Sequence, residues 1–150
     1  MSAENKAIIH RWFEEVWNQG REETIDELLT PDATIFGLGE SDTVVHGPAE
    51  FKPFSRNLRS AFPDLHIRIE DTIAEGSRVV VRVVLEGTHN GNGIGIPPTG
   101  RRVQVGGLVV VEVADGKLIA GWNIWDQQGL LRQIGAVPTR LTDRFLAARD

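Results

Sequence analysis

The sequence contains no cysteine. Disulfide bonds, thiolate metal ligands and cysteine nucleophiles are therefore excluded. It also has no apolar run long enough for a membrane span or for the core of a signal peptide. We therefore expect a cytoplasmic protein.

Basic charge is scarce as well. Lys and Arg number 16 against 21 Asp and Glu, which gives a formal net charge of −5, and Arg101-Arg102 is the only adjacent basic pair. A nucleic-acid binder would normally show a basic face, so that class is not expected.

Several catalytic motifs are missing too. The four histidines show no metal-ligand spacing such as His-x-x-x-His. There is no Gly-x-Ser-x-Gly elbow, and the glycines at 91–95 lack the lysine of a phosphate loop. Neither a metal site nor serine hydrolase chemistry is expected.

The remaining composition is that of a globular protein. Hydrophobic residues make up 41% and charged residues 25% of 150 residues. This length suits one domain, 1–150, with a core large enough to contain a pocket.

Apolar residues at three- and four-residue spacing predict helices, and alternating or valine-rich runs predict strands. The expected helices are 3–18, 22–29, 48–61, 127–134 and a terminal one at 139–148, with Thr30-Pro31-Asp32 closing the second. The expected strands are 33–36, 43–46, 65–73, 78–88, 103–113 and 118–126. In the third strand, alternation puts Leu65, Ile67, Ile69 and Asp71 on one face.

Helices followed by a long meander indicate an α+β fold. We expect a cone-shaped domain with a strongly curved, mostly antiparallel sheet and N-terminal helices that enclose a pocket. Valines in 79–84 and 103–113 stand at both odd and even positions, so they point to both faces of the sheet. The second face therefore also needs something packed against it. A homodimer formed through the sheet face would supply it.

Four stretches carry a family resemblance. They are 86–91 (Glu-Gly-Thr-His-Asn-Gly), 95–101 (Gly-Ile-Pro-Pro-Thr-Gly-Arg), 115–119 (Asp-Gly-Lys-Leu-Ile) and 122–135 (Trp-Asn-Ile-Trp-Asp-Gln-Gln-Gly-Leu-Leu-Arg-Gln-Ile-Gly). With the Trp-Asn-Gln-Gly helix end at 17–20, the chain resembles the SnoaL-like polyketide cyclase family, part of the nuclear transport factor two-like superfamily.

The resemblance implies a dimeric domain that uses neither a metal nor an organic cofactor. Characterised members close the last ring of an aromatic polyketide by intramolecular aldol condensation, and a pocket aspartate is the general acid/base. It lies on the strand before the final short helix, and the matching residue here is Asp126. The expected partner is a small apolar molecule that contains carbonyl groups.

Asp126 also fits this role by position. Strand alternation puts Trp122, Ile124 and Asp126 on one face, where apolar neighbours would desolvate the carboxylate. Desolvation suits a carboxylate to both taking and giving a proton. The alternative is structural, because Asp126 immediately precedes the 127–134 helix and could be its N-cap.

Other candidate residues have similar alternatives. His89 could orient a substrate carbonyl or partner Asp126, or it could hydrogen-bond the backbone of the 90–99 loop. His46 could point into the mouth of the cone or be an exposed turn residue, and Arg82 could bind an anion or lie on the dimer face. The candidate pocket lining, which packing alone could also explain, comprises Trp12, Phe13, Phe36, Phe51, Trp122 and Ile124.

Two other function classes stay open. A hydrolase of the epoxide-opening kind would need a second carboxylate and an arginine near Asp126, and only Glu112 and Arg82 can be named. A non-catalytic domain of the same fold would use the pocket or the sheet face only to bind.

Overall fold

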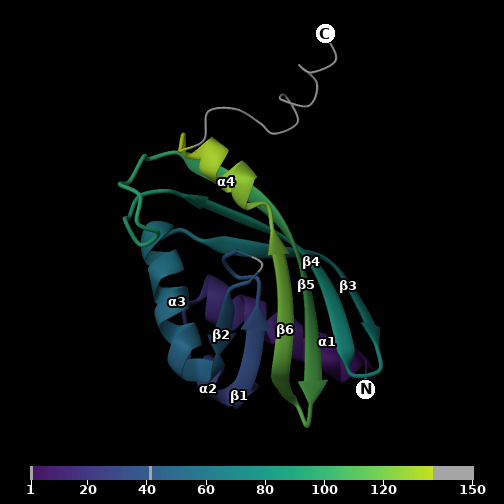
Figure 1. Cartoon of the computed structure of the whole chain (residues 1–150). Helices are drawn as coiled ribbons and strands as arrows, with labels where there is room; N and C mark the ends of the chain where they lie inside the picture. The colour runs from purple at the N-terminus through teal and green to yellow at the C-terminus, as the bar shows by residue number, and fades with distance from the viewer. Residues whose placement is uncertain (1, 41, 137–150) are drawn as a thin grey trace.

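The computed structural model describes residues 2–40 and 42–136. Within them the chain runs from three helical segments through two short strands and a long helix into a four-stranded meander, and a short helix follows (Figure 1). The elements are α1 Ser2–Arg11, the π-helix η1 Trp12–Asn18, α2 Glu22–Leu28, β1 Leu29–Phe36, β2 Val44–His46, α3 Gly47–Ala61, β3 His66–Glu75, β4 Arg78–Thr88, β5 Arg102–Ala114, β6 Lys117–Trp125 and α4 Gln127–Gln133.

The strands form one open sheet in the order β2-β1-β6-β5-β4-β3. Neighbours are antiparallel except β1 and β6, which run parallel. The sheet curls around α1, η1 and α3, which cover its concave face, and α4 lies across the far end of the meander (Figure 1). The expected cone-shaped α+β fold is confirmed.

The core lies between the helices and the concave face. On β4, Val79, Val81 and Val83 are buried, whereas Val80 and Val84 on the opposite face are only half-buried. Each fully buried side chain of this size contributes about 1.5–3 kcal/mol to folding. We call the opposite, convex side of the sheet the outer face.

One segment differs from the prediction near β1. Thr30-Pro31-Asp32 does not close a helix but belongs to β1, which starts at Leu29 directly after α2. Proline is tolerated in this strand because the pairing with β6 is irregular between Leu29 and Thr34.

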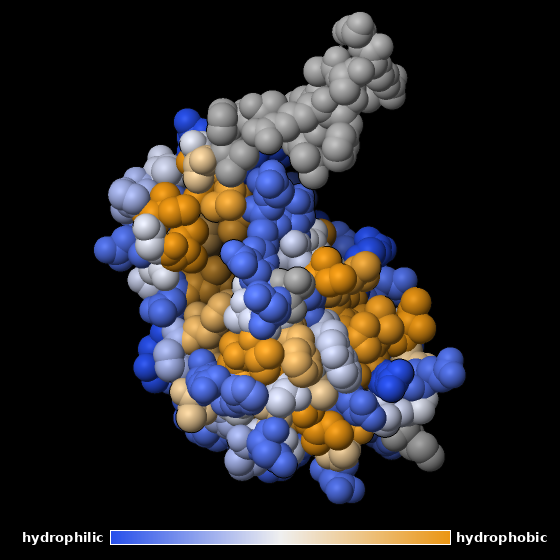
Figure 2. Space-filling model, in the orientation of Figure 1, coloured by the Kyte–Doolittle hydropathy of each residue, from blue (hydrophilic) through white to orange (hydrophobic). Residues whose placement is uncertain are grey.

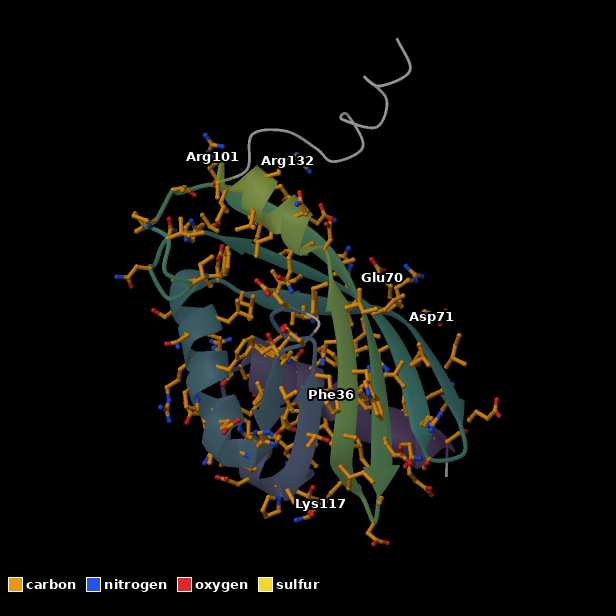
Figure 3. All side chains as sticks on the ribbon, viewed as in Figure 1. Phe36, Glu70, Asp71, Arg101, Lys117 and Arg132 are labelled. Atoms are coloured by element: carbon orange, nitrogen blue, oxygen red, sulfur yellow. The ribbon has the colours of Figure 1, made fainter. Side chains whose placement is uncertain are left out.

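A second difference concerns β3. Its pairing with β4 shifts between Ile69 and Asp71, so Glu70 is an extra residue in the strand. Such a bulge reverses the alternation beyond it. Asp71 is therefore exposed on the outer face, and its predicted place on the same face as Ile67 is wrong (Figure 3).

The first predicted helix is continuous in space, but its second half is a π-helix. The amide of Gln19 donates to Glu14 O at 2.9 Å, five residues back. This wider winding brings residues five apart to the same side. Trp12 and Trp17 consequently both pack on Phe51, with ring centroids 5.1 and 5.5 Å away.

The predicted helix at 139–148 lies outside the described residues. Within residues 2–40 and 42–136, no helix has the length and apolar character needed to cross a membrane.

Candidate active site

Two neighbouring chambers lie inside the cone, between the helices and the concave face of the sheet. The inner chamber is lined by Ile9, Trp12, Phe13, Trp17, Leu29, Ile35, Leu38, Phe51, Val109, Val111, Leu118, Ala120, Gly121 and Asn123. The outer chamber is lined by Trp17, Leu38, Phe54, Leu58, Phe62, Ile67, Leu85, Val105, Trp125, Asp126, Gln127 and Leu130. Apolar side chains also mark the recess between α3 and α4 at the surface (Figure 2).

Trp17 and Leu38 line both chambers, and we call this shared border the neck. The cavity volumes are about 30 Å³ for the inner chamber and about 80 Å³ for the outer one. Space for a single water needs about 10–15 Å³ on this scale, so both chambers have room for ligand atoms. A polycyclic ligand would have to widen the outer chamber or extend through its mouth.

Asp126 lies at the wall of the outer chamber. It follows the last residue of β6 and is the N-cap of α4, where its Oδ1 accepts a hydrogen bond from the amide of Gly129 at 2.9 Å. The residue as a whole is exposed, so one side of it faces the chamber and another faces water. The predicted cap is confirmed, and Asp126 lines a chamber. The expected desolvation of its carboxylate by Trp122 and Ile124 is wrong, because Asp126 is exposed and those two side chains lie on the opposite face of the sheet.

Gly129 makes this arrangement possible. A Cβ atom added there would overlap the carboxylate of Asp126. The absence of a side chain at Gly129 therefore lets the carboxylate lie against the first turn of α4.

Two amide side chains join Asp126 in the chambers, and sequence reasoning missed both as site residues. Gln127 lines the outer chamber and donates to the carbonyl of Gly39. Asn123 lines the inner chamber; its Nδ2 donates to Phe36 O at 3.1 Å, and its Oδ1 accepts from the indole of Trp125 at 3.3 Å. Both amides therefore fasten the segment after β1 to β6 and α4.

The predicted facing of β6 is wrong. Trp122 is 41% exposed and Ile124 is 76% exposed, and both lie on the outer face. Gly121, Asn123 and Trp125 point into the chambers instead. The prediction extended the strand to Asp126 and therefore put Trp122 and Ile124 on the same face as that residue. Because β6 ends at Trp125, strand alternation does not set the direction of Asp126.

Phe36 lies on the outer face with Trp122. It pairs with Trp122 across β1 and β6, and the two rings stack at a centroid distance of 6.0 Å and an interplanar angle of 13°. Figure 3 shows Phe36 on β1 beside β6. Neither ring lines a chamber.

His89 is fully buried beneath the 90–100 loop. Its Nδ1 accepts from the amide of Thr99 at 3.3 Å and lies 3.0 Å from Thr99 Oγ1. Its backbone carbonyl accepts from the amides of Thr99 and Gly100. These are the loop contacts that the sequence offered as the alternative to a catalytic role.

The imidazole of His89 is not part of either chamber wall, but it packs against one. Its ring centroid is 5.5 Å from that of Phe62, which lines the outer chamber. Its Nε2 is buried without a hydrogen-bond partner among the described residues. His89 therefore lies outside the outer chamber and packs against Phe62 in its wall.

The other predicted site residues fall into two groups, those that line a chamber and those that do not. Trp12, Phe13 and Phe51 line the inner chamber, as expected. His46 is exposed before α3, where its amide donates to Glu50 Oε1 at 2.8 Å. Arg82 is exposed on the outer face opposite Leu108, so neither His46 nor Arg82 reaches a chamber.

Asp64 fixes the strand end that leads to His89. Its carboxylate accepts from the amide of Thr88 at 2.7 Å and from Thr88 Oγ1 at 2.8 Å. The hydrogen bond from the amide, with help from the hydroxyl, holds the pKa of Asp64 below its ordinary value.

Comparison with known proteins gives a consistent assignment. The family model described as SnoaL-like polyketide cyclase matches residues 7–134. Nogalonic acid methyl ester cyclase of Streptomyces nogalater is 32% identical over 122 residues, which cover 79% of this chain and 89% of the relative. Aklanonic acid methyl ester cyclase DnrD of Streptomyces peucetius is 28% identical, and the match covers 81% of this chain and 84% of the relative.

Solved structures share the fold over nearly the whole chain. A protein of Jannaschia sp. CCS1 assigned to the SnoaL-like polyketide cyclases has a TM-score of 0.82 at 29% identity, covering 91% of this chain and 95% of its own. AclR of Streptomyces galilaeus, assigned as a hydroxylase, has a TM-score of 0.83 at 27% identity, covering 99% of this chain and 92% of its own.

Proposed function

The chain belongs to the SnoaL-like polyketide cyclase family, and from this we propose that it is a cofactor-independent cyclase that closes a ring by intramolecular aldol addition. The substrate is an apolar small molecule that carries several carbonyl groups. The observation that carries the proposal is the carboxylate of Asp126 at the wall of an apolar chamber.

In the proposed reaction the carboxylate of Asp126 takes a proton from a carbon atom between two carbonyl groups. The resulting enolate carbon attacks a second carbonyl carbon of the same molecule and forms the new carbon–carbon bond. The alkoxide produced takes the proton back from Asp126. Conjugation stabilises the enolate, so the chain needs only to position the substrate and to move this proton.

The surroundings of Asp126 support such a role. The hydrogen bond from Gly129 fixes Oδ1 and leaves Oδ2 without a partner among the described residues. Apolar rings from η1, α3 and β6 form the walls that would hold a flat substrate. Gln127 is the adjacent polar side chain, and its amide could hydrogen-bond a substrate carbonyl.

The proposal is tested with the substrates named for the two relatives, nogalonic acid methyl ester and aklanonic acid methyl ester. We expect ring closure by the wild-type protein and a loss of about 10²–10⁴-fold in kcat for Asp126→Asn, the range typical of a lost general acid/base. Asp115→Asn, in the β5–β6 turn at the other end of the sheet, is the matched control. Full turnover by Asp126→Asn would rule out the assigned role.

A binding function without catalysis is the second candidate, favoured by the small number of polar groups in the chambers. It predicts that wild-type protein and Asp126→Asn bind these esters equally and that neither closes the ring. The hydrolase alternative has less support because Arg82 and Glu112 lie on the outer face, where Glu112 contacts Ser77 and Arg78.

A further inference from the structure

The inner chamber is almost entirely apolar. Asn123 is the single polar side chain in its lining, and the other lining residues present carbon surfaces or indole rings. Its volume of about 30 Å³ exceeds the space that one water needs. Apolar cavities of this kind stay dry and favour apolar guests, so the chamber suits a small hydrocarbon group better than water.

Gly121 keeps this space open. It lies in β6 between strands whose inward residues carry side chains, and a Cβ atom added there would meet nothing closer than Val110 O at 3.8 Å. Its φ angle is not positive, so the backbone does not require glycine. A glycine inside a strand weakens it, whereas an alanine would fit and would fill part of the chamber.

The neck residue Leu38 is held by the segment around it. Gly37 has a φ of +77° and its amide donates to Thr43 O at 3.0 Å. The side chains of Asn123 and Gln127 bind the carbonyls of Phe36 and Gly39 on either side of Leu38. The other residue of the neck, Trp17, belongs to η1 and is buried.

We propose that the inner chamber is a subsite for a short apolar substituent, of methyl to ethyl size, on the molecule whose reacting carbonyls lie beside Asp126. The inference deepens the proposed function, because it assigns the far end of the same site. Trp17 and Leu38 select the width of the substituent, and Gly121 sets the length that fits.

The proposal is tested by binding without turnover. The probes are phenol and its 4-methyl, 4-ethyl, 4-propyl and 4-butyl derivatives, titrated by calorimetry into the full chain. In the wild type we expect Kd to tighten about fourfold for each carbon atom added up to 4-ethylphenol, as for burial of one methylene, and then to stop improving. If Kd tightened by the same factor for every carbon atom up to 4-butylphenol, the proposed size limit would be overturned.

Gly121→Ala should bind phenol as the wild type does but 4-ethylphenol about fourfold more weakly. Gly106→Ala is the matched control, because it also adds one methyl group to a strand but lies on the outer face with nothing within 4 Å. It should reproduce the wild-type series. Equal affinity of Gly121→Ala and wild type for 4-ethylphenol would contradict the proposal.

A crystal of the complex with 4-bromophenol locates the substituent directly. We expect the anomalous signal of bromine between Trp12 and Gly121. Bromine in the outer chamber or on the surface would overturn the assignment.

If circular dichroism shows that Gly121→Ala does not fold, Leu38→Trp is used instead, because it narrows the neck. It should abolish the gain in affinity from phenol to 4-ethylphenol. Because the binding series requires no turnover, failure of the proposed catalysis is distinguishable from failure of the subsite.

Discussion

At the scale of single residues, Gly129 controls where the carboxylate of Asp126 lies. In Gly129→Ala the new methyl group displaces this carboxylate from the α4 cap. The lost cap costs about 1 kcal/mol, and the better helix propensity of alanine returns about the same. We expect a free energy of unfolding close to that of the wild type but at least tenfold lower cyclase turnover, measured by urea denaturation and product formation.

Gln128→Ala is the matched control, since it changes an exposed neighbour on the same helix without approaching Asp126. It should keep both stability and turnover. If Gly129→Ala turns over substrate as fast as the control, the position of the Asp126 carboxylate is not important for catalysis.

Asp126 also shows how much of the candidate site could be predicted from the sequence. The sequence shows that Asp126 follows a strand and precedes a helix. The helix-cap interpretation is confirmed by the hydrogen bond from Gly129, whereas the acid/base role stays a prediction. The direction of its neighbours was not readable, because the end of β6 fell one residue earlier than expected. Asn123 and Gln127 carried no signal of their own, since isolated amides are common on surfaces.

At the scale of elements, Asp64 joins the start of β3 to the end of β4. Because its pKa is depressed in the folded state, its contribution to stability is present above the unfolded value of about 3.9 and is lost as pH falls through the folded value. We expect Asp64→Asn to be less stable than wild type at pH 7 and to lose less stability below pH ~4.

Thermal unfolding at a series of pH values measures this difference. The side chain is half exposed, so the effect should be small. Asp42→Asn, at an exposed position in the loop after β1, should follow the wild-type curve. Parallel curves for Asp64→Asn and wild type across the acid range would show that Thr88 does not hold the carboxylate in solution.

Helix and strand placement was largely predictable because periodicity is local. The π-winding of η1, the bulge at Glu70 and the entry of Pro31 into β1 were not. Each depends on which residue of a distant element lies opposite, as Phe51 lies against both Trp12 and Trp17. A single sequence does not show which residues of distant elements lie opposite one another.

At the scale of the whole molecule, the outer face carries an apolar row that crosses all six strands. The strand register aligns Val44, Phe36, Trp122, Val110, Val80 and Ile73. Leu108 and Ile124 form a neighbouring pair and are 51% and 76% exposed. Figure 2 shows hydrophobic surface over the strands of the meander.

We propose that this face joins two copies of the chain in a homodimer, since a continuous exposed apolar surface of this extent marks an interaction site. Leu108→Glu combined with Ile124→Glu should convert the dimer to a monomer in sedimentation at micromolar concentration. Asn92→Asp and Asp126→Asn, which lie away from the row, should remain dimeric. A wild-type protein that sediments as a monomer at that concentration would contradict the interface.

The parallel pairing of β1 with β6 has a consequence for how the protein is made. Ile35 and Gly121 form adjacent parts of the inner chamber, yet one belongs to the first strand and the other to the last. During synthesis α1, η1, α2, β1, α3 and the β3–β4 hairpin are made before β6. The β6 edge of β1 therefore has no partner until nearly the whole chain exists. Pairing over such a separation is slow. The two chambers, which β6 lines, therefore form late in folding, and we expect a chain interrupted before β6 to lack both of them.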